Sequence, residues 1–398
     1  MKIGMILDRV FPPDIRVEKE ARTLIKAGHE VYLLCMKAPN LPDVDVLDGI
    51  SLFRCNFYPE HFLGNKIGKL MERITFKNQK LIDQIQKFVD VDSIDVLHVH
   101  DLPKVKSALI AGRIKGIPVI ADLHENYPEA IQFYTGKKFI SRFFRFLNGA
   151  KRWKKYENYC LNRVNHVIVV VDEAKERVVN DYEIPAEKVT IVSNTEDVDY
   201  FESFNLSHDL INSYKSYFTI TYIGSFGPHR GLDVPIKAMT LLKEKIPNIR
   251  LLMVGKGNIR GELEKLAAGL GVSQSVEFTG WQPFEFMPSY IALSDVCLVP
   301  HHSNPHTDST IPHKLFQYML MEKPVVVSTC KPLARIVNET QAGLVFESGN
   351  VDDFVRVCLE LIDEKKRKQL GENGKQAVLK KYNWSETGKE LIRVYDKI

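Results

Sequence analysis

The polar loop that follows the apolar run Val296–Val299 is the strongest candidate for chemistry in this sequence. It leads into a helical pattern, where Pro312 suits a first turn and Ser309 or Thr310 could cap the helix. A helix N-terminus presents unpaired N–H groups and a positive dipole end, and Lys314 adds a charge nearby. The loop therefore predicts a phosphate-binding site. An ordinary capped loop is the alternative, but it leaves the density of polar residues unexplained.

Two glycine-bearing turns occupy similar positions in the same half of the chain. In the first, IGSFGPHRG, Gly224 and Gly227 allow a backbone to approach a ligand, and Arg230 has a fork suited to a diphosphate. The second is VGKG at Val254–Gly257. Each turn is a weak signal by itself, because glycine-rich turns between strands and helices are common. Together with the polar loop, they place three candidate turns at predicted strand ends.

Histidines and acidic residues follow two predicted strands in the first half. His98, His100 and Asp101 end one of them, and the segment Asp122–Glu125 ends the other. Arg16, in the first strand-to-helix loop, could reach the same place. A hydrogen-bonded structural role is the alternative, and it stays open for His98 in particular. A metal site is not expected, because a helical HxxxH or similar spacing is missing.

The segment Gly136–Tyr156 carries eight basic residues and no acidic one, interleaved with phenylalanines and Trp153. A basic helix with large apolar residues is typical of a membrane-surface element, here one in contact with anionic lipid. The alternative is a solvated charged face above an aromatic stripe that faces the core. Nucleic acid is not an expected partner, because no nucleic-acid-binding motif surrounds the segment.

Strand-like and helix-like stretches alternate along most of the chain, which is typical of parallel sheets covered by helices. A polar stretch near 201–216 interrupts the alternation. We therefore predict two doubly wound, Rossmann-like α/β domains, 1–204 and 205–382, that face a central cleft, with a C-terminal helix 383–398 that could pack back on the first. Strands are expected at Lys2–Leu7, Glu30–Cys35, Val96–Val99, Pro118–Asp122, Val167–Val171, Phe218–Ile223, Leu251–Val254, Val276–Phe278, Val296–Val299 and Pro324–Val327.

The composition excludes several classes of protein. The 398 residues are 44% hydrophobic and carry a net charge of +4, which is ordinary for a folded protein and gives no overall signal for nucleic acid. The sequence has no apolar run of roughly 20 residues that could span a membrane. The N-terminal apolar stretch is short and interrupted by Asp8 and Arg9, so we expect a cytoplasmic protein without a leader. The six cysteines are scattered, which favours reduced thiols.

With these features in place, the sequence resembles the family-4 retaining glycosyltransferases of the GT-B fold, also called group 1, over nearly its full length. The motifs that carry the resemblance are AGHEV (Ala27–Val31), DVLHVHD (Asp95–Asp101), DLHENYPE (Asp122–Glu129), VIVVVDE (Val167–Glu173), VSNTEDVDYF (Val192–Phe201), YIGSFGPHRGLD (Tyr222–Asp233), VGKG, FTGW (Phe278–Trp281) and STIPHKLFQYMLMEKPVVVS (Ser309–Ser328). Their order and spacing are more specific than any one of them.

The resemblance implies a nucleotide-sugar donor held mainly by the second domain, an acceptor held by the first, and no metal or other cofactor. It assigns donor binding to Gly224, Ser225, Arg230, Gly255, Gly257, Asp308, Ser309, Thr310, Ile311, Pro312, His313 and Gln317. It assigns acceptor binding to Arg16, His100, Asp101 and Glu125.

The sequence departs from the family pattern at two motifs. In the basic pair that usually binds the diphosphate, the arginine slot holds Ser225 and the lysine slot holds Arg230. The two glutamates of the family signature fall on Ser309 and Gln317. Gln317 can still hydrogen-bond a ribose through its amide, and the adjacent Asp308 could replace the first carboxylate.

The resemblance also implies the chemistry. The family histidine beside the reacting sugar matches His124, while Arg230, Lys314 and the helix start at Pro312 are expected to stabilise the leaving diphosphate. The resulting hypothesis is metal-independent, retaining hexosyl transfer by front-face attack. The enzyme would transfer a sugar from a UDP-sugar to a glycan or lipid-linked acceptor in surface polysaccharide synthesis. It would contact the inner face of the membrane through residues 136–156. The alternatives are a nucleotide-sugar epimerase of the same fold and a non-catalytic scaffold that the Ser309 and Gln317 substitutions would permit.

Overall fold

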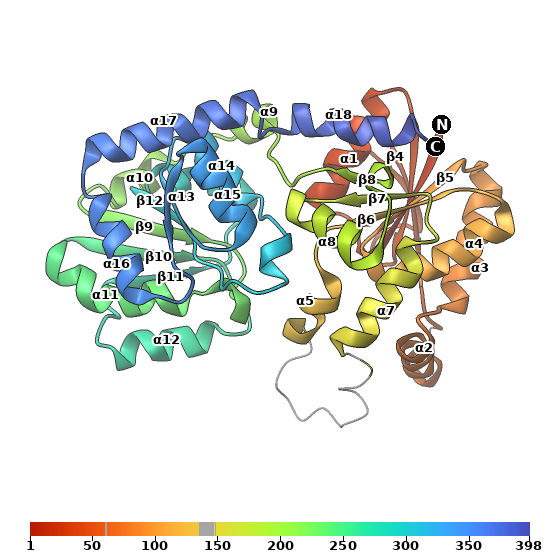
Figure 1. Cartoon of the computed structure of the whole chain (residues 1–398), viewed down its shortest axis with the longest axis horizontal. Helices are drawn as coiled ribbons and strands as arrows, with labels where there is room; N and C mark the ends of the chain where they lie inside the picture. The colour runs from red at the N-terminus through yellow and green to blue at the C-terminus, as the bar shows by residue number, and fades with distance from the viewer. Residues whose placement is uncertain (60–61, 135–146, 148) are drawn as a thin grey trace. The chain divides into compact units, whose positions relative to one another are not determined.

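The structure is a computed structural model that describes the chain except residues 60–61, 135–146 and 148. It divides into two compact units. The first unit consists of Met1–Ser193 together with Thr387–Ile398, and the second consists of Asn194–Glu386. Each unit contains a β-sheet flanked by helices (Figure 1). The predicted α/β class is therefore confirmed in both halves of the chain.

The first unit contains an eight-stranded sheet in the order β3-β4-β2-β1-β5-β6-β7-β8. Its strands are parallel except for the edge pair β3 and β4, which is antiparallel. The sequence prediction missed this pair, which turns at Asp48 and Gly49, both with positive φ, as a two-residue hairpin requires. The strands are β1 (Lys2–Val10), β2 (Glu30–Met36), β3 (Val44–Leu47), β4 (Ile50–Cys55), β5 (Val96–His100), β6 (Val119–Leu123), β7 (His166–Val169) and β8 (Val189–Ile191).

The helices of the first unit follow capping rules that the sequence already displays. Asp14 caps α1 by accepting a 3.2 Å hydrogen bond from the backbone N–H of Val17, and Gly28 leaves the helix with a φ of +88°. The described helices are α1 (Ile15–Lys26), α2 (Phe62–Thr75), α3 (Gln79–Asp92), α4 (Val105–Lys115), α5 (Tyr127–Tyr134), α7 (Ala150–Leu161) and α8 (Asp172–Tyr182).

The second unit contains a six-stranded, all-parallel sheet in the order β11-β10-β9-β12-β13-β14. Its strands are β9 (Phe218–Ile223), β10 (Ile249–Val254), β11 (Val276–Gly280), β12 (Val296–Val299), β13 (Val325–Ser328) and β14 (Gly343–Phe346). Its helices are α9 (Val198–Glu202), α10 (His208–Ser213), α11 (Asp233–Lys245), α12 (Arg260–Gly269), α13 (Met287–Ala292), α14 (Lys314–Leu320), α15 (Lys331–Thr340), α16 (Val351–Glu360) and α17 (Glu364–Lys380). Because β9, β10 and β12 are neighbours, the turns that follow them lie at one edge of the sheet.

The units divide at Ser193 and Glu386, in place of the boundaries at 204 and 382 that the sequence suggested. The reason lies in the segment after β8, where Asn194 and Glu196 make their side-chain hydrogen bonds to residues of the second unit. The last helix, α18 (Trp384–Tyr395), continues into the first unit, where the hydroxyl of Tyr395 lies 2.6 Å from Nδ1 of His98.

Candidate active site

Two glycine turns of the second unit pack backbone against backbone. Gly224 follows β9 with a φ of +142°, and Gly255 follows β10 with a φ of +141°. A Cβ on Gly255 would lie 1.9 Å from the carbonyl oxygen of Gly224, and one on Gly257 would lie 2.1 Å from that of Phe226. Both distances are shorter than any real contact, so these positions require glycine. The N–H groups of Gly224 and Gly255 donate within the fold, to the carbonyls of Val254 and Gly280 at 2.8 Å each, so the turns leave open space at the strand ends.

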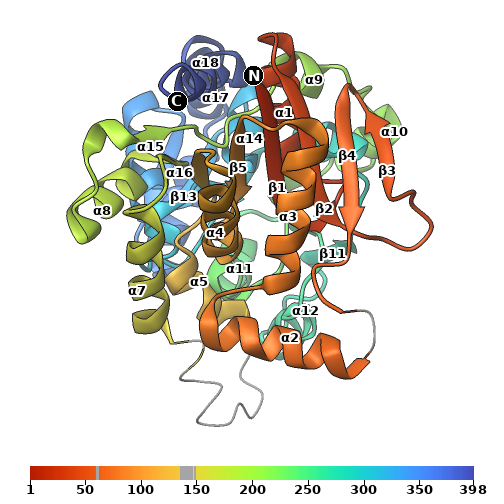
Figure 2. The same ribbon diagram turned by 90° about the vertical axis from the view of Figure 1, so that its right-hand side faces the viewer.

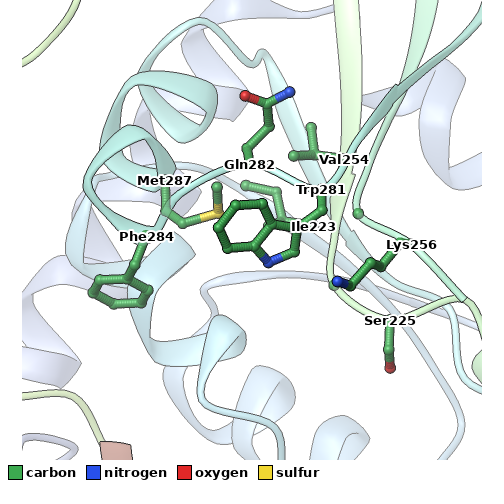
Figure 3. A pocket seen from close by; sticks show the side chains of 10 residues that line it. Ile223, Ser225, Val254, Lys256, Trp281, Gln282, Phe284 and Met287 are labelled. Carbon is green, nitrogen blue, oxygen red and sulfur yellow. The ribbon is translucent and has the colours of Figure 1, made fainter. Parts of the chain in front are cut away.

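A cavity of about 360 Å³ opens beside these turns. It is lined by Ile223, Gly224, Ser225, Val254, Gly255, Lys256, Trp281, Gln282, Phe284 and Met287. Figure 3 shows the indole of Trp281 beside Met287, with Lys256 and Ser225 at one margin. Trp281 is 62% exposed, and Nζ of Lys256 lies 5.5 Å from its ring centroid. An exposed indole in a mostly apolar cavity at the carboxyl ends of parallel strands suits the stacking of a flat ring.

The basic pair predicted for a diphosphate, Arg230 and Lys314, lies around the first of these turns. Nζ of Lys314 is 3.9 Å from the centroid of the Tyr222 ring and 2.6 Å from where a Cβ on Gly224 would stand. The guanidinium of Arg230 donates a 3.0 Å hydrogen bond from Nη1 to Nε2 of His301. Among the described residues, neither side chain forms an ion pair with a carboxylate.

The surroundings of Arg230 favour an anion. Burial and the Arg230 charge lower the pKa of Lys314 well below its usual value. The same two causes lower the pKa of His229 to about 3, that of His306 to about 4, and that of His301 well below its ordinary range. The charge of Arg230 thus disfavours protonation of the basic groups around it, and a bound diphosphate would compensate that charge.

The polar loop after β12 is held by its own hydrogen bonds. Ser309 is buried, and its hydroxyl donates to the carbonyl of Pro305 at 2.8 Å. Asp308 accepts hydrogen bonds at 3.0 Å from the hydroxyl of Ser303 and at 3.2 Å from the backbone N–H of Lys331. Both predicted ligands therefore use their side chains to shape the loop, and the expectation that Asp308 replaces the missing carboxylate gains no support.

The predicted helix start is wrong by two residues. Helix α14 begins at Lys314, and His313 precedes it without a side-chain capping bond. Thr310 ends a short 3₁₀ turn in extended conformation, and Pro312 lies between that turn and the helix. Neither Ser309 nor Thr310 caps α14, because the chain between 310 and 313 separates them from its first turn.

Gln317 lies on α14 and is largely buried. Its Nε2 donates a 2.6 Å hydrogen bond to Oε2 of Glu196, a fully buried residue that the sequence analysis did not single out. Ile311 is also buried, and its carbonyl accepts a 3.0 Å bond from Nδ2 of Asn194. The Gln317 amide, predicted to bind a ribose, is instead hydrogen-bonded to the segment that starts the second unit. The only signal for Glu196 in the sequence was its place within NTEDVD.

In the first unit, His124 lies between two carboxylates. Its Nε2 donates to Oδ2 of Asp122 at 2.7 Å, and its Nδ1 is 3.6 Å from Oδ2 of Asp101. Burial by itself would lower the pKa of His124, but Asp101 and Asp122 outweigh it and raise the pKa to about 9. His124 is therefore an imidazolium at neutral pH, and it stays partly exposed at the end of β6. Asp101 also accepts a 3.1 Å bond from Arg9.

Arg16 and His100 both contact Asp122, the carboxylate that binds His124. Arg16 is buried and donates to both oxygens of Asp122, at 2.8 and 3.3 Å, and to the carbonyl of Val192 at 3.0 Å. His100 is buried too, and its Nδ1 lies 3.2 Å from Oδ2 of Asp122. The prediction that Arg16 and His100 contact the acceptor is corrected here, because neither is exposed. Asp101 and Glu125 are partly exposed.

Four buried residues of this network, Glu20, His98, His100 and Asp122, have ligand-type atoms within 4.8 Å of one another. Carboxylate and imidazole atoms could coordinate a divalent cation. The Arg16 guanidinium already lies 3.0 Å from Glu20 and 2.8 Å from Asp122, so a positive charge balances both carboxylates. Burial raises the pKa of Glu20, which further weakens it as an anionic ligand. We assign the cluster to the support of His124.

The predicted membrane segment 136–156 falls largely on residues 135–146 and 148, which lie outside the described part of the chain. Within the described part, Trp153 and Tyr156 of α7 are buried against the ring of Phe76, while Lys151 and Lys155 are exposed. Trp153 and Tyr156 thus face the core, and the membrane contact of the segment stays a prediction. No helix in the described residues is long and apolar enough to cross a membrane.

Comparison with protein families gives two matches that follow each other along the chain. Residues 15–200 match the model described as Glycosyltransferase Family 4, and residues 205–377 match that described as Glycosyl transferases group 1. Among curated proteins, an uncharacterised glycosyltransferase of Methanocaldococcus jannaschii is 25% identical over 99% of this chain and 98% of its own. A UDP-Gal:alpha-D-GlcNAc-diphosphoundecaprenol alpha-1,3-galactosyltransferase of Escherichia coli is 18% identical over 81% of this chain and 78% of its own.

Solved structures share the fold. Sucrose-phosphate synthase from Thermosynechococcus elongatus superposes with a TM-score of 0.80 at 18% identity, over 100% of this chain and 98% of its own. HepE of Anabaena, in complex with UDP-glucose, superposes with a TM-score of 0.74 at 14% identity, over 100% of both chains. The predicted GT-B fold class is confirmed by these neighbours.

Proposed function

Because the chain belongs to the group 1 glycosyltransferases, with a first unit of the family 4 type, we propose that it is a retaining enzyme that transfers a sugar from a UDP-sugar to a lipid-linked or glycan acceptor. The observation that carries the proposal is the basic pair Arg230 and Lys314 at the Gly224 turn. The pair lacks a carboxylate partner among the described residues and lies next to the cavity that contains Trp281.

The two parts of a nucleotide diphosphate fit the two parts of this site. The cavity of about 360 Å³ offers an exposed indole and apolar walls for a base. Arg230 and Lys314 offer charge-assisted hydrogen bonds to the diphosphate, and the closely packed Gly224 and Gly255 turns keep side chains away from it. The relative whose name includes UDP-Gal and the HepE complex with UDP-glucose favour uridine as the base.

The proposed chemistry relies on stabilisation of the leaving group. The bond between the anomeric carbon and the diphosphate oxygen breaks, and its electron pair leaves with the diphosphate. Arg230 and Lys314 stabilise the charge that develops there, which makes a metal ion unnecessary in this proposal. The acceptor hydroxyl attacks from the same face and passes its proton to the departing phosphate oxygen. The new bond then has the configuration of the old one.

His124 is the residue of the first unit proposed to meet the sugar or the acceptor. Between Asp101 and Asp122, its imidazolium places a positive charge at the end of β6, next to the proposed position of the acceptor. A lipid-linked acceptor is favoured by the diphosphoundecaprenol in the name of the Escherichia coli relative.

Nucleotide binding tests the proposal most directly. Thermal unfolding would be followed with UDP, GDP and their sugar conjugates, for the wild type, Arg230→Ala and the surface control Arg356→Ala. A ligand at 100 times its Kd adds about 2.7 kcal/mol to the free energy of unfolding. We expect UDP and a UDP-sugar to stabilise the wild type and the control but not Arg230→Ala. If no nucleotide stabilises the wild type, the scaffold alternative takes precedence. UDP-sugar turnover without any acceptor would instead indicate an epimerase.

A further inference from the structure

Helix α2 of the first unit turns its apolar side away from the protein. Surface helices normally direct their apolar stripe toward the core. None of the residues of α2 is buried, and six large apolar side chains are between 36% and 74% exposed. They are Phe62, Leu63, Ile67, Leu70, Met71 and Ile74. We call these six side chains the α2 apolar face. Exposed apolar side chains that are contiguous on one helix mark an interaction site for a protein or a membrane.

The side of α2 that contacts the protein is small and polar. Asn65, Gly68 and Glu72 are spaced three and four residues apart, so they lie on one stripe. A Cβ on Gly68 would stand 3.5 Å from the ring of Tyr58, which shows how closely this stripe approaches the protein. Glu72 accepts hydrogen bonds from Nζ of Lys104, at 2.7 Å, and from the hydroxyl of Tyr58. The only acidic residue of the helix is therefore turned inward and neutralised.

The outward side of α2 is positively charged as well as apolar. Lys66, Lys69 and Arg73 are exposed beside the apolar face. Nζ of Lys66 lies 4.1 Å above the ring of Phe62, so the two can enter an interface together. An exposed apolar stripe flanked by basic residues is the pattern of helices that lie in the plane of a membrane surface.

The helix is fixed to the first unit at its C-terminal end. Nη2 of Arg152 donates a 2.6 Å bond to the carbonyl of Ile74, and Nζ of Lys106 donates a 2.7 Å bond to that of Thr75. Basic groups at this end also oppose the negative end of the helix dipole. Figure 1 and Figure 2 both show α2 at the margin of the first unit, beyond the end of α3. These bonds attach the C-terminal end of α2 to the first unit.

We propose that α2 docks the protein on an anionic lipid surface, with the α2 apolar face among the acyl chains near the headgroups and Lys66, Lys69 and Arg73 on the lipid phosphates. Charge decides between this occupant and a second copy of the chain. A symmetric contact of α2 with itself would bring the three basic residues against their own copies, whereas a negatively charged membrane complements them.

Docking through α2 would place the strand ends of the first unit at the membrane. Lys104, which holds Glu72 of α2, also lies 3.1 Å from Asp8 at the end of β1. The next residue, Arg9, pairs with Asp101 beside His124. A lipid-linked acceptor could then reach His124 from the surface on which α2 lies. This last step rests on the proposed function, but lipid binding by α2 does not, since it needs neither donor nor acceptor.

Vesicle flotation of the full chain tests the docking. Phosphatidylcholine vesicles with and without phosphatidylglycerol would be mixed with the wild type, with Leu63→Gln/Ile67→Gln/Leu70→Gln and with Lys66→Gln/Lys69→Gln. We expect binding to the anionic vesicles only, reduced about tenfold or more by the apolar triple variant. Each lysine removed should weaken binding by about fivefold at low salt.

Matched controls come from apolar and basic side chains exposed elsewhere. Val91→Gln/Ile114→Gln changes exposed residues of α3 and α4, and Lys215→Gln/Lys265→Gln changes exposed lysines of the second unit. Both controls should bind vesicles as the wild type does.

The proposal is overturned if the wild type does not bind anionic vesicles, or if the α2 variants bind as well as the controls. It is also overturned if the wild type is a dimer that the apolar triple variant converts to a monomer without change in lipid binding. Nucleotide-induced thermal shifts of the same variants report on the donor site separately.

Discussion

Nε2 of Gln317 donates a 2.6 Å hydrogen bond to Oε2 of Glu196, and both side chains are almost completely buried. The backbone of Glu196 is engaged as well, because its carbonyl accepts a 2.8 Å bond from the N–H of Trp384. One residue thus joins α14 to the segment that enters the second unit and to the start of α18. The glutamine at 317, which is a departure from the family pattern, is explained locally, since Glu196 already places a carboxylate beside it.

Replacement of Gln317 by glutamate should therefore destabilise the protein, although it restores the family residue. Two buried carboxylates would face each other where a hydrogen bond now stands, and one would have to take up a proton. We expect Gln317→Glu to lower the free energy of unfolding at pH 7 by about 2–4 kcal/mol, as for an uncompensated buried charge. The loss should shrink as the pH falls toward 5, because protonation of one carboxyl restores a donor.

Chemical denaturation at several pH values measures this effect. The matched control is Gln369→Glu, which introduces the same charge at an exposed position of α17 and should change stability by less than about 0.5 kcal/mol. An unchanged midpoint for Gln317→Glu at pH 7 would mean that the Glu196 contact contributes nothing to the fold.

The close packing of the two glycine turns predicts a steric effect. A Cβ on Gly255 would stand 1.9 Å from the carbonyl oxygen of Gly224, and the φ of +141° disfavours any other residue. We expect Gly255→Ala to cost about 2 kcal/mol or more and to abolish nucleotide-induced stabilisation, because both turns must separate.

Gly261→Ala is the contrasting substitution. Gly261 lies in α12, where a Cβ would meet no heavy atom within 4 Å. Because alanine is the better helix former, this variant should be more stable by about 0.5–1 kcal/mol and should bind nucleotide normally. Thermal unfolding of the two variants, with and without UDP, compares them directly. Equal behaviour would argue against the packed turns as the donor site.

Much of this arrangement could be predicted from the sequence, and the exceptions have physical reasons. The buried parallel strands were recognisable as continuous apolar runs, and the strand ends directed attention to Gly224, Arg230 and His124. The hairpin β3–β4 was missed because its residues alternate at a solvent-facing edge. The side-chain roles of Ser309 and Gln317 could not be predicted, because they depend on hydrogen bonds that only the folded chain brings together.

The pair of carboxylates around His124 predicts how stability depends on pH. The pKa of this histidine is raised to about 9 in the folded protein, above its ordinary value near 6.5. Because the pKa is raised on folding, the protonated histidine stabilises the folded protein fully below the pKa of the unfolded chain. This stabilisation is lost as the pH rises through the pKa of the folded protein. We therefore expect the free energy of unfolding to fall between pH 7 and 10 by on the order of 1–3 kcal/mol.

His124→Asn removes this ionisation, so its stability should change less over the same range, while His208→Asn on the exposed end of α10 should behave as the wild type. Denaturation curves from pH 6 to pH 10 measure the difference. NMR titration of the His124 ring gives an independent value, and an ordinary pKa near 6.5 would show that Asp101 and Asp122 do not hold the proton.

The last prediction concerns the proton balance of donor binding. Burial and the charge of Arg230 lower the pKa of Lys314, so its amine loses its proton at a lower pH than an ordinary lysine does. A diphosphate beside Nζ would favour the ammonium form and raise the pKa of Lys314 again.

Binding of UDP should therefore take up protons from the buffer. Calorimetry in two buffers with different ionisation enthalpies detects the uptake as a difference in apparent binding enthalpy. Lys314→Gln should weaken binding and abolish the difference, while Lys237→Gln, on the exposed side of α11, should leave both unchanged. Proton uptake that persists in Lys314→Gln would move the titrating group to the histidines around Arg230.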